Sequence, residues 1–295
     1  MLYSLKKEEI EKLKNAHLLP DFRNAEMLFA TYLTDGGIVK EILPKPLLPT
    51  EIPLASIFFA RYPETNFGCV YNEGALSLHC KYKRERGLYC LSMPVDDDMA
   101  MIGGREQYGY PKKIADKITL EKNDDQVVGS VIRKKKEILR IECELVKEAS
   151  TDFMEETASQ LVDWDGISCY RVIIFLYKYF QSPGGMGFDY LPRLIREPVL
   201  FRKQENILEG KGAVKVASSP YDPLGEIPVK EVKNMYYGKW HNTMLPGKVI
   251  GRVWNPYRFL KHTFFKTDFA PTLLENYKLE EVEMAKKRMK KARKF

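Results

Sequence analysis

The chain has 295 residues, of which 44% are hydrophobic and 12% aromatic, so it can bury a full core as one large domain or two smaller ones. Its formal net charge is +7, but residues 284–295 (MAKKRMKKARKF) carry seven Lys and Arg and no acid, so the rest of the chain is balanced and nucleic acid is not an expected partner. The longest apolar stretch, residues 172–180, is too short for a membrane span, and the charged N-terminus does not resemble a signal peptide, which together favour a cytoplasmic protein.

Short apolar segments dominate the chain. Residues 4–18 have the spacing of an amphipathic helix. From about residue 27 to residue 253, runs rich in Val, Ile, Leu, Phe and Tyr are separated by turn sequences. Residues 127–136 and 138–146 are predicted to form two neighbouring antiparallel strands, and a further helix is predicted near residues 272–292. The pattern predicts an antiparallel sheet or barrel with few helices.

The cysteines and histidines give no indication of a metal site. The five cysteines lack CxxC spacing, so we interpret them as small buried side chains. The four histidines are scattered and form no HExxH pair. The acidic run at residues 96–98 is more typical of an exposed turn than of a cation site. We therefore expect no metal.

Two adjacent lysines, Lys112 and Lys113, stand in the segment GGREQYGYPKKIA at residues 103–115. A lysine adds to a ketone only as the neutral amine, so its pKa must fall from about 10.4 to near 7, at a cost of about 4 kcal/mol. A second ammonium about 7 Å away contributes roughly 2.4 kcal/mol at an effective dielectric of about 20, so burial in an apolar cavity must contribute the rest. Successive strand residues face opposite sides, so both ammonium groups share a cavity only if the backbone turns after Pro111. Without further context, a lysine doublet is usually a solvated surface pair.

This segment resembles the acetoacetate decarboxylase family, which has a GRE sequence followed by Pro-Lys-Lys. Further similarity lies in FRNAEMLFATYLTD and LPKPLLP (within residues 22–49), YNEG (71–74), DPLGEIPVKEV (222–232) and LPGKVI (245–250). The resemblance implies an α+β fold that is mainly antiparallel β, a closed or cone-shaped acetoacetate decarboxylase-like β-barrel with a few peripheral helices. The similar segments span about residues 21–255, the expected barrel domain. The residue patterns on either side predict an N-terminal helical arm (1–20) and a C-terminal extension with a basic helix (256–295).

The resemblance implies roles for individual residues. Lys112 corresponds to the Schiff-base nucleophile, and Lys113 to the neighbouring cation that favours the neutral amine. Glu73 in YNEG falls on the family's active-site glutamate, which orients the substrate or carries a proton. Arg105 falls on the arginine of GRE and could bind the substrate carboxylate or form an ion pair with the adjacent glutamate, and we favour the ion pair. Tyr110 is expected either to line the pocket or to pack behind it.

Two positions depart from the family pattern. The family's N-terminal active-site arginine aligns with Ala25, and its earlier acidic pocket residue aligns with Phe58. Arg23 lies two residues from Ala25 and would share its face on a regular strand, so it could restore the positive charge. If Arg23 points to solvent instead, the site keeps the lysine but suits a different, more apolar acid.

The activity that the resemblance implies is decarboxylation of acetoacetate or a related β-keto acid through a lysine imine, with no external cofactor. The implied partners are a small oxo-acid substrate and further copies of the chain in a homo-oligomer. Two alternatives stay open. The first is another imine reaction of an oxo acid, such as aldol condensation, dehydration or cyclisation. The second is a noncatalytic barrel that binds a small apolar ligand.

Overall fold

The computed structural model describes residues 3–15, 19–150, 159–184, 187–271 and 288, and its strands join in one large sheet. The strands are β1 (Asp21–Leu33), β2 (Leu48–Pro49), β3 (Leu54–Tyr62), β4 (Glu64–Thr65), β5 (Tyr71–Tyr82), β6 (Glu85–Val95), β7 (Lys112–Ile114), β8 (Lys117–Asn123), β9 (Gln126–Arg133), β10 (Lys136–Glu148), β11 (Ser159–Trp164), β12 (Ile167–Lys178), β13 (Arg193–Lys203), β14 (Leu208–Val216), β15 (Glu231–Met244) and β16 (Lys248–Arg252). The predicted antiparallel pair is confirmed as β9 and β10.

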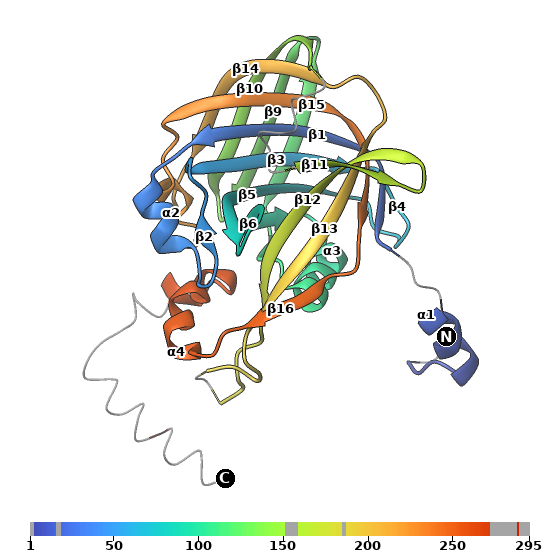
Figure 1. Cartoon of the computed structure of the whole chain (residues 1–295), viewed down its shortest axis with the longest axis vertical. Helices are drawn as coiled ribbons and strands as arrows, with labels where there is room; N and C mark the ends of the chain where they lie inside the picture. The colour runs from blue at the N-terminus through green and yellow to red at the C-terminus, as the bar shows by residue number, and fades with distance from the viewer. Residues whose placement is uncertain (1–2, 16–18, 151–158, 185–186, 272–287, 289–295) are drawn as a thin grey trace.

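Seven of these strands close into a barrel, in the order β13, β12, β6, β5, β3, β1 and β15 (Figure 1). The ring closes because β15 pairs with both β1 and β13. It is mixed because β12 runs parallel to β6, while the other pairs in the ring are antiparallel. Beyond β15, strands β14, β10, β9 and β8 continue the sheet outside the ring. The predicted fold class is therefore confirmed.

The two faces of the barrel strands have different neighbours, as the alternation of side chains along a strand requires. On β1, Leu28 and Tyr32 lie in the main hydrophobic core, together with Phe59 of β3 and Ile141 of β10. The alternate residue of β1, Met27, faces the interior of the ring. Because the sheet continues past β15 and covers the outer face, both faces of these strands are buried. All five cysteines are buried and free, which confirms their interpretation.

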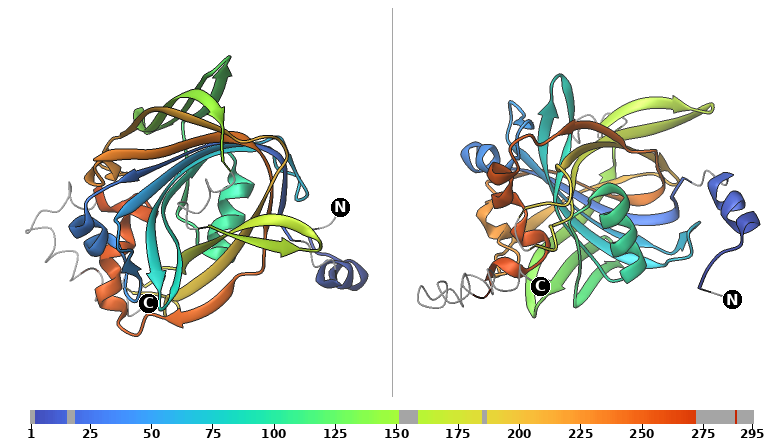
Figure 2. Two further views of the ribbon diagram at one scale, coloured as in Figure 1. Left: turned by 45° about the horizontal axis from the view of Figure 1, so that its top comes forward. Right: turned by 90° about the horizontal axis from the view of Figure 1, so that it is seen from below.

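Helices are few and lie at the edges of the barrel. They are α1 (Lys7–Asn15), α2 (Gly36–Ile42), α3 (Asp98–Gly103) and α4 (Pro256–Phe259), with a π-helical turn at Gly104–Tyr108 and 3-10 turns at Leu224–Glu226, Leu260–His262 and Phe264–Lys266. Helix α1 lies within the predicted segment, and its described side chains are exposed. Asp97, in the acidic run, caps α3 by accepting a hydrogen bond from the Ala100 amide. Figure 2 shows α3 at one end of the barrel. The predicted basic C-terminal helix lies outside the described residues.

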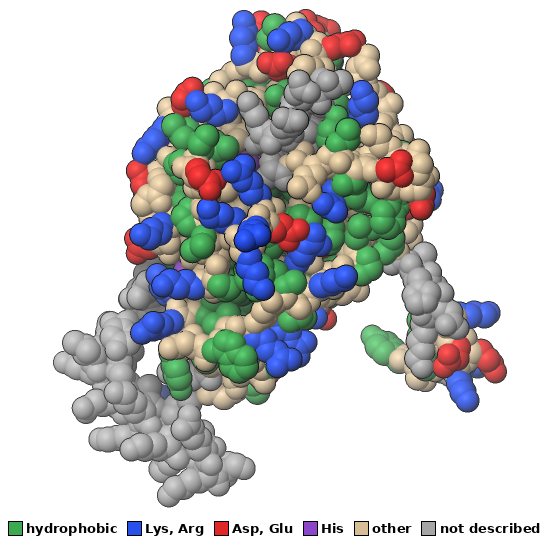
Figure 3. Space-filling model, in the orientation of Figure 1, with side chains coloured by type: hydrophobic (Ala, Val, Ile, Leu, Met, Phe, Trp, Pro, Cys, Tyr) green, Lys and Arg blue, Asp and Glu red, His purple; other side chains and the backbone are tan. Residues whose placement is uncertain are grey.

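On the face shown in Figure 3, basic, acidic and apolar side chains are interspersed. Among the described helices, none has the length and apolar character needed to cross a bilayer.

A buried cluster of four charges fastens the C-terminal segment to the barrel. The Lys113 ammonium lies 2.7 Å from an Asp222 carboxylate oxygen and 2.9 Å from an Asp268 carboxylate oxygen. The Arg133 guanidinium contacts both carboxylates as well. The formal charges of the cluster sum to zero. Lys113 lies on β7, Arg133 on β9, Asp222 just before the 3-10 turn at Leu224–Glu226, and Asp268 after α4. The cluster therefore joins four distant parts of the chain.

We expect Asp222→Asn to lower the free energy of unfolding by roughly 3–5 kcal/mol, because it leaves two buried cations with Asp268 as the one remaining carboxylate of the cluster. The matched control is Glu64→Gln at the Arg23–Glu64 pair, whose side chains are about half exposed. An exposed pair of this kind contributes at most about 1 kcal/mol. Urea denaturation of both variants checks this, and equal losses would contradict the structural role of the cluster.

Candidate active site

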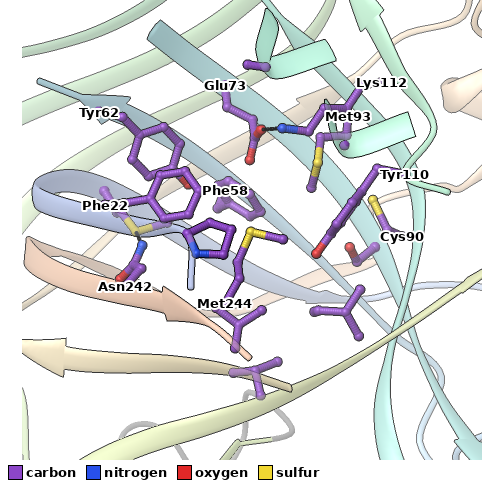
Figure 4. A pocket seen from close by; sticks show the side chains of 18 of the residues that line it. Phe22, Phe58, Tyr62, Glu73, Cys90, Met93, Tyr110, Lys112, Asn242 and Met244 are labelled. Atoms are coloured by element: carbon purple, nitrogen blue, oxygen red, sulfur yellow. Dashed lines mark hydrogen bonds and ion pairs between the residues drawn. The ribbon is translucent and has the colours of Figure 1, made fainter. Parts of the chain in front are cut away.

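A cavity of about 470 Å³ lies inside the barrel. Its wall is mostly aromatic and sulfur-containing, and several of these side chains are visible in Figure 4. They include Phe22, Phe58, Tyr62, Met93, Tyr110 and Met244. Among the described lining residues, Lys112 and Glu73 alone carry charge. The cavity therefore combines one charged pair with a largely apolar wall.

Lys112 and Glu73 are neighbours in the wall of this cavity. The Lys112 ammonium lies 2.7 Å from a Glu73 carboxylate oxygen, as the dashed line in Figure 4 marks. Both residues are buried, with 7% and 4% of their surface exposed. The Tyr71 hydroxyl lies 3.5 Å from each of them, donating to Glu73 and accepting from Lys112. The lysine nitrogen also lies 5.2 Å from the centre of the Tyr71 ring and 5.8 Å from that of Tyr110. The structure thus brings together Lys112, Glu73 and Tyr110.

The GGRE segment shapes the approach to Lys112. Gly104 packs against the aliphatic stem of Lys112, and a Cβ at Gly104 would lie 2.8 Å from the lysine Cδ and Cε. Gly109 has φ +93°, which favours glycine, and its backbone turns the chain into β7. Arg105 donates one hydrogen bond to the carbonyl of Lys112 and one to that of Lys266. Arg105 therefore holds backbone and lies outside the described cavity lining.

Lys113 faces the opposite side of β7 from Lys112. It lines a second cavity, of about 510 Å³, and belongs to the neutral charge cluster with Asp222 and Asp268. The cause is the alternation of a regular strand, since the backbone after Pro111 does not turn enough to bring both ammonium groups together. The structure therefore does not place the two lysines in one cavity.

A third lysine, Lys266, is half-buried and lines the Lys113 cavity. Its ammonium donates a hydrogen bond to the Gly109 carbonyl over 2.8 Å and lies 4.7 Å from the centre of the Tyr179 ring. Burial, helped by the Arg105 charge, lowers the pKa of Lys266 to about 7. Part of its side chain remains accessible from the second cavity. Lys266 is therefore a rival amine, which any test of Lys112 must distinguish.

Arg23 does not share the face of Ala25. The pairing of β1 with β15 shifts register between Phe22 and Ala25, and Asn24 has φ +52°. This bulge inserts a residue, so Phe22 faces the cavity and Arg23 turns outward to a Glu64 carboxylate 3.0 Å away. The expectation that Arg23 restores a positive charge beside Ala25 is wrong for this reason. Phe58 lines the cavity, so an apolar ring occupies this part of the wall.

Glu197 is a buried carboxylate that the sequence reasoning missed. It is fully buried on β13, and neither carboxylate oxygen has a hydrogen-bond partner of good geometry among the described residues. Burial raises the pKa of Glu197 to about 8, while the neighbouring Tyr110 hydroxyl and the Lys112 charge oppose the rise. Strand alternation could have revealed it. Glu197 lies on the same face of β13 as Ile195 and Val199, and this face points into the barrel.

The chain is similar in sequence to known acetoacetate decarboxylases. Residues 10–253 match the family described as acetoacetate decarboxylase (ADC). An acetoacetate decarboxylase of Burkholderia ambifaria is 30% identical over 213 residues, which are 72% of this chain and 80% of that protein. The chain belongs to the acetoacetate decarboxylase family. The acetoacetate decarboxylase of Chromobacterium violaceum is 40% identical over 111 residues, but this match spans only 37% of the chain and 44% of that family member.

Solved structures share the family fold. An acetoacetate decarboxylase from Legionella pneumophila superposes with a TM-score of 0.72 at 19% identity, covering 86% of this chain and 100% of that chain. The enduracididine biosynthesis enzyme MppR, complexed with the condensation product of pyruvate and imidazole 4-carboxaldehyde, has a TM-score of 0.58 at 16% identity and covers 79% of this chain and 89% of its own. At these identities the likeness concerns the fold alone.

We expect Glu197→Gln to change how stability depends on pH. The wild-type carboxyl holds its proton up to about pH 8, whereas the unfolded chain releases it near 4.5. Between these values the folded state binds more protons, so wild-type stability falls as pH rises, by on the order of 5 kcal/mol in total. The glutamine variant lacks this loss.

Thermal unfolding of both proteins at pH 5, 6.5 and 8 checks the expectation. The variant should gain stability relative to wild type as pH rises. Any effect of the new amide that does not depend on pH cancels in this comparison. If the difference in stability between the two proteins is the same at all three pH values, Glu197 ionises normally in the folded protein.

Proposed function

We propose that this protein decarboxylates a β-keto acid through an imine formed by Lys112. The observation that carries the proposal is the position of Lys112, buried in an apolar cavity with its nitrogen 2.7 Å from Glu73. A lysine that forms an imine needs a route to its neutral form and a group that can carry protons. The Glu73 carboxylate is within hydrogen-bond distance for both tasks. Family membership supports the same reaction class.

The pair itself offers the route to the neutral amine. If one proton passes from the Lys112 ammonium to the Glu73 carboxylate, two charges become an amine and a carboxylic acid without any charge entering or leaving the cavity. A poorly polar surrounding favours this exchange relative to water, because isolated charges are costly to bury. Lys113 has no direct part in this step, since its charge is balanced on the other face of β7. Glu73 is therefore the proposed acid and base.

The reaction then needs no further group. The Lys112 amine attacks the ketone carbon to give a carbinolamine, and the acid form of Glu73 protonates the departing hydroxyl so that water leaves and an iminium remains. The bond between the α-carbon and the carboxylate breaks, and its electron pair moves toward the iminium nitrogen as carbon dioxide leaves. The resulting enamine takes a proton at carbon from water, with Glu73 as the relay, and a further water molecule adds to the iminium carbon and releases the ketone and the lysine amine. Because negative charge spreads out in this transition state, an apolar wall suits it.

A second candidate keeps the imine and changes its fate. The structural likeness to MppR, which was complexed with a condensation product of pyruvate, supports condensation of an oxo acid as this alternative. In this case the enamine would attack an aldehyde in place of taking a proton.

Borohydride trapping tests the proposal. Reduction in the presence of a β-keto acid should fix the ketone on Lys112 as a secondary amine, and peptide mass analysis should locate it there and not on Lys266. Lys112→Met should lose this adduct and bring carbon dioxide release down to the spontaneous rate. Lys266→Met is the matched control, because it removes the half-buried amine of the second cavity, and it should keep the adduct on Lys112.

Three outcomes would count against it. An adduct on Lys266 alone would assign the chemistry to the second cavity. No adduct with any oxo acid would favour a noncatalytic barrel. An adduct on Lys112 without carbon dioxide release, together with consumption of an added aldehyde, would favour condensation.

A further inference from the structure

We propose that the substrate is a 3-oxo acid carrying a long alkyl or aromatic substituent on its ketone carbon, of roughly fifteen to twenty non-hydrogen atoms in all. The inference rests on the proposed function and specifies which β-keto acid the site accepts. It comes from the size of the cavity, the chemistry of its wall and the placement of its charges.

The cavity is too large for acetoacetate alone. An engineered apolar cavity of about 150 Å³ holds one benzene molecule, and acetoacetate has nearly as few non-hydrogen atoms as benzene. The cavity beside Lys112 measures about 470 Å³, which is about three times that space. A bound acetoacetate would leave most of this volume to water against an apolar wall, which is unfavourable. A larger substituent would fill it.

The wall is suited to hydrocarbon. Phe29 and Phe58 lie with their ring centres 6.0 Å apart, and both line the cavity. Val199 of β13 and Met244 of β15 add aliphatic and thioether surface. Aromatic and methionine side chains adapt to varied apolar shapes and contribute much contact area.

The charges of the site do not favour binding through the carboxylate. Lys112 and Glu73 neutralise each other, and no further charged side chain occurs in the described lining. Arg23 is paired at the surface, and Arg105 is bound to backbone carbonyls. The carboxylate of a substrate therefore contributes little binding free energy here, whereas each methylene that is buried against the wall adds to it.

The cavity also extends away from the reactive pair. In Figure 4, Lys112 and Glu73 lie on one side of the drawn cavity and Asn242 and Met244 on the other. Once the ketone carbon is bonded to Lys112, a substituent on that carbon would point into this apolar space. The small carboxymethyl end stays near the pair, where carbon dioxide leaves.

A substrate series on the wild-type protein tests the inference. The acids are acetoacetate, 3-oxohexanoate, 3-oxodecanoate, 3-oxotetradecanoate and 3-oxo-3-phenylpropanoate. Each is measured by carbon dioxide release, with the Lys112→Met protein as the blank for spontaneous loss. We expect kcat/KM to rise about fourfold for each added methylene until the cavity is full, and the phenyl compound to exceed acetoacetate. Borohydride adducts on Lys112 are measured with every acid.

The two proposals fail differently. If adducts form on Lys112 and acetoacetate has the highest kcat/KM, the inference is overturned while the proposed function stands. If no acid gives an adduct on Lys112, the proposed function fails first.

Val199→Phe gives a second measurement by narrowing the cavity. Relative to acetoacetate, kcat/KM for 3-oxodecanoate should fall by at least about tenfold. The reason is that the larger side chain fills the space in which several methylenes of the substrate would be buried. An unchanged ratio in a folded variant would also overturn the inference. Met244→Phe serves the same purpose if the first variant does not fold.

Discussion

The ion pair between Lys112 and Glu73 is buried in a largely apolar cavity wall, and the remaining features of the site follow from it. Each group is tolerated in the apolar cavity because the other lies 2.7 Å away. Such a pair can exchange its proton and become neutral without moving net charge. The same pair that permits burial therefore provides, in our proposal, both the neutral amine and the acid that imine chemistry needs. The barrel supplies the apolar wall that makes the neutral form accessible.

The two lysines of the doublet lie on opposite faces of β7. In our proposal Lys112 carries out the chemistry, whereas Lys113 forms ion pairs that hold the strand in place. Lys113 joins the strand to Asp222 and Asp268, which fixes the backbone that carries Lys112. Arg105 holds the Lys112 carbonyl from the other side of the GGRE turn. Because Asp268 lies beyond the family match, which ends at residue 253, the C-terminal segment of this chain takes part in positioning the proposed nucleophile. The Lys113 charge is thus balanced by carboxylates on the face of β7 away from Lys112.

Much of the fold could be predicted from the sequence, because strand alternation and turn sequences are local signals. The pairing of β9 with β10 is one example. The faces of side chains near irregular backbone could not be predicted in this way. The bulge at Asn24 reverses the face of Arg23, and it depends on pairing with a strand more than 200 residues away. Glu197 was missed although it interrupts an inward apolar phase, because a lone acid in a strand is usually assigned to the solvent face.

The rate at which borohydride-trappable imine forms on Lys112 in the Glu73→Gln protein tests the central claim most directly. The amide keeps the size of the side chain and removes its capacity to take a proton. The account predicts that this rate falls at least about a hundredfold below wild type in a single turnover near neutral pH, and that it recovers as pH rises. A wild-type rate in the folded variant would show that Lys112 loses its proton by another route, and would contradict the role of the pair.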